Sequence, residues 1–448
     1  MEIAQLNFDD RDEFLRKSIA DKVISLLTSD INISPMVIDG SWGTGKTEFC
    51  HKLINLMNKN GSHHLIYIDA FKADHANEPL MTVLAEVIKV LPEGDKSNFL
   101  ERALPALRFT LRTVGKATVS HVLRQDSADI LEGFKEEVQE TANAAIDATV
   151  RALIKDHIKA EKNLKALQAA LKEIAEIKPI VLFVDELDRC RPDFAIDMLE
   201  IIKHTFDVTG VSFVLITNTH QLKASINHCY GLAVDAQRYL DKFLKFTITL
   251  PETVNTGSHQ ESVAALEHYK VLVSHSALLK ELKLFECGTL RIIERIIKVN
   301  NLSLREIETF VRHIEIYVTL AERCYLKSNT VFGFKTFTIM TIIIYCIRPE
   351  LAKSIINKKL DCKQLGDVLG VSTLSSAEEG YDHADEVELI CYLLGRSAFK
   401  NGDMFTPNEK ESNFWEQEAK VLFRGGHLTS RDNYSRICGE VIQVISMC

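Results

Sequence analysis

The sequence lacks the residue spacings that mark disulfide-rich and zinc-binding proteins. Its ten cysteines stand singly between Cys50 and Cys448, with no CxxC pair and no cysteine–histidine spacing suited to zinc. His63 and His64 are adjacent, and no further histidine follows them at a metal-ligand spacing on a helix. We therefore interpret the cysteines as reduced thiols of a cytoplasmic protein, most of them in its core.

Long apolar segments and an excess of positive charge are also missing. The N-terminal MEIAQLNFDDRDEF is acidic and has no apolar run typical of a signal peptide. The best membrane candidate, residues 336–347, falls well short of the ~20 residues that a span needs, so we expect a buried helix or strand. The net charge of −9 argues against a protein that coats a nucleic-acid backbone, but it does not argue against a single local basic patch. The length of 448 residues fits two or three domains.

A glycine-rich segment, GSWGTGKT at residues 40–47, has the spacing G-x-x-x-x-G-K-[ST]. Its glycines allow consecutive backbone N–H groups to converge on an anion, and the apolar MVID before it and the helical pattern after it predict a strand–loop–helix unit. A glycine-rich turn that matches by chance is the alternative. We predict a nucleotide site in which Lys46 reaches the β- and γ-phosphates and Thr47 binds Mg²⁺. The binding residues are Gly40, Ser41, Trp42, Gly43, Thr44, Gly45, Lys46 and Thr47.

An acidic strand end is the expected partner of this loop. The apolar run at 180–184 predicts a strand buried on both faces, and Asp185 follows it at the edge where parallel sheets bind ligands. We expect Asp185 to hold Mg²⁺ through water and Glu186 to take a proton from the attacking water. Acids that merely cap the following helix are the alternative.

A third strand is predicted over residues 211–217. A polar side chain at its end would lie between the loop and the Asp185 strand. Asn218 is our candidate for orienting the attacking water, and a simple turn residue is the alternative.

Four segments together resemble the KAP family of P-loop NTPases. They span residues 36–251 and read GSWGTGKT, VDELDRCRPDFAIDMLEIIK, FVLITNTHQL and RYLDKFLKFTITLP. The resemblance implies a parallel sheet with the loop strand central and the Asp185 strand not its immediate neighbour. It also places Asp188 and Arg189 near the site, with Arg189 reading the γ-phosphate or reaching across a subunit interface, and Lys242 close by. Surface ion pairs are the alternative for Arg189 and Lys242.

Two positions depart from the family pattern. Glu186 stands where the family usually has a second aspartate, a change that suits catalysis, and Asn218 replaces the usual aspartate after the third strand. A sensing role at the second position is therefore less well supported by the resemblance.

The expected fold is an α/β P-loop NTPase with a parallel sheet core, a long helical insertion and a C-terminal all-helical domain. The parts are an N-terminal helix with the first half of the core (1–70), the insertion (71–178), the second half of the core (179–251), a helical lid (252–350) and a helical region without assigned chemistry (351–448).

Two patterns within the insertion have alternative interpretations. Arg108, Arg112 and Lys116 put three cations on one helix face, which indicates either a solvated face or an anionic partner. A short apolar seam with alternating spacings of three and four residues fits either helix packing within the chain or self-association. It consists of Leu164, Leu167, Leu171 and Ile174.

These features predict an enzyme that binds ATP and Mg²⁺ and hydrolyses ATP, with GTP as the other nucleotide, to drive or switch a change in a partner or assembly. A slowly hydrolysing nucleotide switch is one alternative. A DNA-binding initiator or clamp factor is another, because residues 185–188 also resemble the acidic box of origin-recognition AAA+ proteins. We expect the protein to act on an effector or another partner protein. Homo-oligomers are an alternative, and the composition does not indicate nucleic acid as a partner. The family resemblance implies a prokaryotic setting, with a role in anti-phage defence.

Overall fold

The computed structural model describes residues 6–76, 78–92, 96, 99, 150–255, 261–285, 287–375, 383–424 and 432–447. The chain divides into an N-terminal unit, made of Met1–Asp12 and Arg16–Pro251, and a C-terminal unit, made of Glu13–Leu15 and Glu252–Cys448. The predicted cationic face at Arg108, Arg112 and Lys116 lies outside the described residues.

The N-terminal unit alternates strands and helices. Its strands are β1 (Met36–Asp39), β2 (His64–Asp69), β3 (Ile180–Asp185), β4 (Val211–Thr217) and β5 (Phe246–Thr249). Its helices are α1 (Lys17–Leu27), α2 (Lys46–Asn58), α3 (Ala70–Ala73), η2 (Asp74–Ala76), α4 (Pro79–Val90), α8 (Val150–Ile177), η3 (Leu187–Arg189), α9 (Pro192–Thr205), α10 (Thr219–Tyr230) and α11 (Ala236–Leu240).

The five strands form one parallel sheet in the order β2-β3-β4-β1-β5. β1 therefore pairs with β4 and β5, and β4 separates it from β3, as the family resemblance implies. The predicted α/β class with a parallel core is confirmed. Because all strands run the same way, the segments that follow β1, β3 and β4 emerge at the same edge of the sheet.

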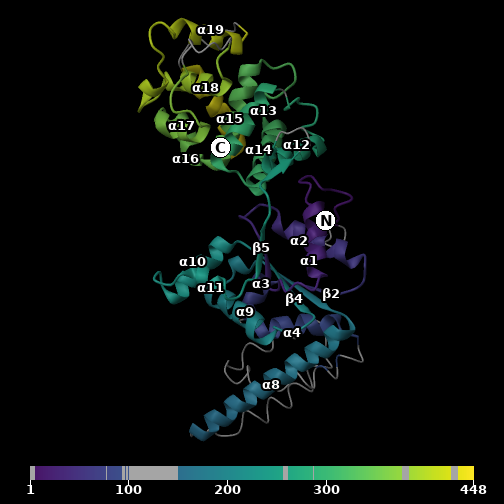
Figure 1. The fold of residues 1–448 in the computed structure, drawn as a ribbon. Coiled ribbons are helices and arrows are strands. Elements are labelled where there is room, and N and C mark those ends of the chain that lie inside the picture. The colour runs from purple at the N-terminus through teal and green to yellow at the C-terminus, as the bar shows by residue number, and fades with distance from the viewer. Residues whose placement is uncertain are drawn as a thin grey trace. The chain divides into compact units, whose positions relative to one another are not determined.

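Helices lie on both faces of the sheet (Figure 1). The interior strands β1, β3 and β4 are buried, which explains why they read as nearly continuous apolar runs, whereas the edge strand β5 is mostly exposed. Alternate residues of β1 point to opposite faces: Met36 and Ile38 pack in a core with α1 and α2, and Val37 packs in a core with α4, α8 and α9. Leu167 and Leu171 of α8 are fully buried in this second core. This part of the predicted seam therefore packs within the chain.

The C-terminal unit is mostly helical (Figure 1). After a short hairpin of β6 (Thr253–Asn255) and β7 (Glu261–Val263), its helices are α12 (Ala264–His275), α13 (Cys287–Asn300), α14 (Leu304–Leu320), α15 (Phe332–Ile347), α16 (Pro349–Ile356), α17 (Cys362–Leu369), α18 (Glu386–Gly395), η5 (Gly402–Phe405), α19 (Ser412–Leu422) and α20 (Asp432–Ser446).

One apolar core serves this whole unit. It includes residues from both sides of position 350, so the expected lid (252–350) and tail (351–448) share a single core. α15 contains the apolar run at 336–347, and its residues from Thr336 to Ile344 are all buried, as predicted for a core helix. Among the helices of the described ranges, none is long and apolar enough to cross a membrane.

Candidate functional site: a phosphate loop opposite paired acids

The loop after β1 adopts backbone angles that require glycine. Gly43 has φ 77° and Gly45 has φ 80°, and Gly45 directly precedes α2. A Cβ on Gly40 would lie 2.8 Å from the Thr44 hydroxyl oxygen. The loop therefore turns tightly into the N-terminus of a helix, where backbone N–H groups and the helix dipole favour an anion.

Lys46, at the first position of α2, is 9% exposed. Its ammonium group donates hydrogen bonds to the carbonyl oxygens of Gly40 at 2.6 Å and Ser41 at 3.0 Å. Burial lowers the pKa of Lys46, while the negative charges of Asp188 and Asp185 act in the opposite direction. The loop thus holds its single lysine over its own backbone, at the place where the motif predicts phosphate.

Asp185 ends β3 and is 1% exposed. The Tyr67 hydroxyl donates to its Oδ2 at 3.1 Å, and the backbone N–H of Glu186 donates to its Oδ1 at 2.8 Å. Burial raises the pKa of Asp185 to about 6, and hydrogen bonding from Thr47 partly offsets this effect. The site therefore contains a buried carboxylate whose charged form needs a cation.

Glu186 connects the acids to the loop. The Thr47 hydroxyl lies 3.4 Å from Glu186 Oε1, and Arg189 Nε lies 2.6 Å from Glu186 Oε2. Glu186 itself has φ 61°, a left-handed conformation that is uncommon outside glycine. The structure thus brings together residues 46–47 and 185–186, which are far apart in the sequence.

Asp188 joins the loop to β4. Trp42 Nε1 donates to Asp188 Oδ2 at 2.6 Å, and the Thr217 hydroxyl donates to Asp188 Oδ1 at 3.1 Å. Asn218 instead caps α10, because its side chain accepts from the N–H groups of His220 and Gln221. Its predicted role in orienting water stays a prediction. Thr217, the last residue of β4, is thus the residue at this strand end that hydrogen-bonds to the acidic segment 185–188.

Sequence reasoning missed three contributors to this site: Tyr67, Thr217 and Arg16, whose guanidinium donates to the carbonyl oxygen of Thr44 at 2.8 Å. Tyr67 was visible as a polar side chain within the apolar strand HLIYID, two residues before the strand ends. Lys242, placed near the site by the family resemblance, lies with its ammonium 5.6 Å from the ring centre of Tyr239.

The donor set fits a magnesium ion that arrives with phosphates. Mg²⁺ is usually bound through one or two protein oxygens together with water and phosphate oxygens. Thr47 and Asp185 supply a hydroxyl and a buried carboxylate that hydrogen-bond to each other. Within the described ranges, no group of three or more His, Cys, Asp and Glu side chains could hold a metal by itself.

A parallel sheet in this order, with a phosphate loop after one interior strand and acids after another, defines a P-loop NTPase fold with a nucleotide-binding loop. The chain belongs to the KAP family: the model of the KAP family P-loop domain matches residues 16–321, more than half of its length. Among solved structures, it is similar to the ORC2 protein of Aeropyrum pernix in ADPNP and ADP complexes, with 11% identity, 97% of this chain and 95% of that chain covered, and a TM-score of 0.28. That score is too low to bear on function. A search of curated proteins finds no match.

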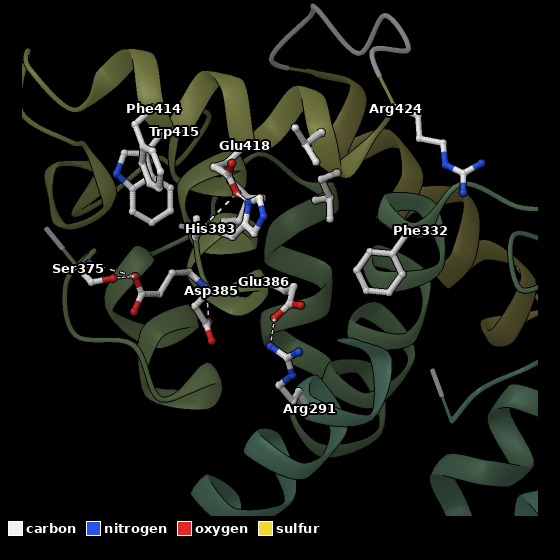
Figure 2. Close-up of a pocket in the computed structure, with 15 residues that line it drawn as sticks. Arg291, Phe332, Ser375, His383, Asp385, Glu386, Phe414, Trp415, Glu418 and Arg424 are labelled. Carbon is white, nitrogen blue, oxygen red and sulfur yellow. Dashed lines mark hydrogen bonds and ion pairs between the residues drawn. The ribbon is translucent and has the colours of Figure 1, made fainter. Parts of the chain in front are cut away.

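The C-terminal unit contains a cavity of about 680 Å³ beside α18 and α19 (Figure 2). Its polar groups are largely paired with one another. Glu386 forms an ion pair with Arg291 at 3.5 Å, and Glu418 lies 3.5 Å from His383 and accepts from the N–H of Ala384. Among the described residues that line the cavity, these acidic side chains are therefore engaged by neighbouring groups.

Proposed function

We propose that this chain binds Mg-ATP and hydrolyses it, and that the cycle changes the state of a partner protein or assembly. The observation that carries the proposal is the meeting of Thr47, at the start of α2, with Asp185 and Glu186 at the end of β3. A phosphate loop alone binds an anion, whereas hydrolysis also needs a metal ligand and a base on a second strand.

Each residue then has a defined role. The loop N–H groups and Lys46 bind the phosphates, and Thr47 and Asp185 hold the metal. Mg²⁺, when bound, neutralises phosphate charge and favours the transition state. Glu186 accepts a proton from the attacking water through the carboxylate oxygen that is released from Arg189.

A slowly hydrolysing switch is the second candidate, and the ion pair between Arg189 and Glu186 favours it. A base engaged by a guanidinium is not available to water, so hydrolysis would wait for a signal that breaks the pair. Steady-state turnover separates the two candidates: tens of turnovers per minute would support a motor, and tight binding with turnover near zero would support a switch.

The first test is Lys46→Ala, compared with Lys59→Ala. Lys59 follows the same helix but pairs with Asp9 on the surface. We expect Lys46→Ala to lose most of its affinity for Mg-ATP in a calorimetric titration, because the loop loses its only lysine, while Lys59→Ala binds as the wild type does. Equal affinities for Lys46→Ala and wild type would overturn the phosphate assignment.

A role in anti-phage defence is proposed from family membership alone. Its test is a plaque assay in which the wild-type gene, but not Lys46→Ala or Glu186→Gln, reduces phage yield in a host that carries the gene with its neighbours. Equal plaque numbers with all three would count against this setting without affecting the nucleotide site.

A further inference from the structure

Arg16 is a buried arginine that sequence reasoning did not assign to the site. It directly precedes α1, and only 3% of its surface is exposed. Its Nη1 donates to the carbonyl oxygen of Thr44 at 2.8 Å, and its Nη2 donates to the carbonyl oxygen of Pro251 at 3.1 Å. One guanidinium therefore connects the phosphate loop to the segment that follows β5.

The bond to Thr44 constrains the loop amide that comes next. In a planar trans peptide, the carbonyl oxygen of Thr44 and the N–H of Gly45 point in opposite directions. Because the Arg16 guanidinium holds that oxygen, it also fixes the direction of the Gly45 N–H, one of the amides that the motif assigns to phosphate. A charged donor makes such a bond stronger than a neutral donor would.

Arg16 and its second carbonyl partner, Pro251, both lie next to points where the chain passes from one unit to the other. Pro251 is the last residue of the N-terminal unit, and Arg16 is the first residue after the short segment Glu13–Leu15 that belongs to the C-terminal unit. Within that unit, the Glu13 carboxylate lies 3.1 Å from His268 Nδ1, and both side chains are 4% exposed. Asp12 accepts from the backbone N–H groups of Arg16 and Lys17, and so fixes the other side of the junction.

We propose that Arg16 is a positioning residue that orients the Thr44–Gly45 peptide for phosphate and links the loop to the chain junction at Pro251. Phosphate binding pulls on the Gly45 N–H and thereby on the Thr44 carbonyl, and the shared guanidinium transmits the change to Pro251. The inference rests on the proposed binding of Mg-ATP, but it does not require hydrolysis.

The test compares Arg16→Lys and Arg16→Met with Lys17→Gln. A lysine retains the charge but cannot span both carbonyl groups as the guanidinium fork does. Lys17 is the neighbouring cation, and it pairs with exposed Asp9 rather than with the loop. For each variant, thermal unfolding measures folding, and calorimetry with Mg-ATP measures the dissociation constant.

We expect Arg16→Lys to weaken Mg-ATP binding about tenfold, which corresponds to the loss of one charged hydrogen bond, and Arg16→Met to weaken it further. Lys17→Gln should bind as the wild type does. A purely structural arginine would lower the unfolding temperature without changing the dissociation constant of the folded protein. If folded Arg16→Lys binds Mg-ATP with wild-type affinity, the positioning role is overturned, whether or not Arg16→Met folds.

Hydrogen exchange of peptides covering residues 246–255 tests the link to Pro251. Mg-ATP should slow exchange there in the wild type and leave it unchanged in Arg16→Lys at saturating nucleotide. An equal effect in both proteins would overturn the link. If the wild type and Lys46→Ala both fail to bind Mg-ATP, the proposed function itself fails, and this outcome is distinct from loss of binding in the Arg16 variants alone.

Discussion

Arg189 Nε lies 2.6 Å from Glu186 Oε2, so the side chain proposed as the catalytic base already has a cationic partner. The two residues are three apart, at the short turn η3 that follows β3. A carboxylate oxygen held by a guanidinium must first separate from that cation before it can contact an attacking water, and the separation costs free energy. If Glu186 is the base, as we propose, this ion pair would restrain hydrolysis.

Replacing either member of this pair should separate binding from turnover. Glu186→Gln removes the base while leaving Asp185 and the loop in place, so we expect turnover to fall about 10²–10⁴-fold with Mg-ATP affinity within a few fold of wild type. Glu86→Gln is the control, since Glu86 pairs with Lys89 in α4. Steady-state phosphate release and calorimetry measure both quantities. Wild-type turnover in Glu186→Gln would place the base elsewhere.

Arg189→Ala should raise basal turnover severalfold at unchanged Mg-ATP affinity, because it frees the Glu186 carboxylate. The same phosphate-release assay measures this. A fall in turnover that is restored by mixing with Lys46→Ala protein would contradict the restraint and would show that the arginine acts on a neighbouring subunit.

The buried carboxylate of Asp185 should make stability depend on pH. Its pKa is raised from 3.8 to about 6 by burial, so the folded chain binds its proton more tightly than the unfolded chain does. The free energy of unfolding that this proton contributes is therefore lost as the pH rises from about 4 to about 6, and it stays lost above pH 6. Without nucleotide or Mg²⁺, Asp185→Asn should be more stable than wild type, by a margin that grows by about 1 kcal/mol between pH 5 and pH 8.

Denaturant unfolding of the two proteins at these pH values checks the margin. A difference that does not change with pH would show that Asp185 is not buried in its charged form. Mg²⁺-dependent nucleotide binding should weaken below about pH 6 in the wild type, because Asp185, the metal ligand that we propose, becomes protonated there.

The sequence was sufficient to predict the strands and the loop because both are encoded locally. Glycine and lysine spacing specifies the loop, and apolar runs ending in Asp185 and Thr217 specify strands buried on both faces. Once the strands are parallel, their ends must share one edge of the sheet. That is why Thr47 and Asp185 could be assigned to one site.

The partners of individual side chains were harder to predict. Asn218 and Thr217 are adjacent, yet only Thr217 reaches Asp188, because Asn218 has already left the strand and caps the next helix. The bond between Trp42 and Asp188 joins residues 146 positions apart, and the bond between Arg16 and Pro251 joins residues 235 apart. Such contacts depend on the packed arrangement of the elements, which no short pattern contains.

Gly45 and Gly61 offer a matched pair for testing the loop geometry. Both have positive φ, 80° and 58°, and a Cβ added to Gly61, outside the phosphate loop, would meet nothing within 4 Å. Alanine at either site should cost about 1–2 kcal/mol of stability from backbone strain. Only Gly45→Ala should also lose Mg-ATP affinity, because the strained turn presents loop amides to phosphate. Equal nucleotide affinity of the two variants would argue against that presentation.

Trp42 should report nucleotide binding directly. Its indole is 49% exposed, and its N–H donates to Asp188, whereas Trp415, the other tryptophan of the chain, is 1% exposed in the core of the C-terminal unit. In Trp415→Phe, all tryptophan emission comes from the loop. We expect Mg-ATP to change the intensity of that emission and its quenching by acrylamide, because phosphate reorders the loop that holds the indole against Asp188. The same titration of the Trp415→Phe/Lys46→Ala double variant should give no change, and an identical response in both proteins would show that the signal does not come from phosphate in the loop.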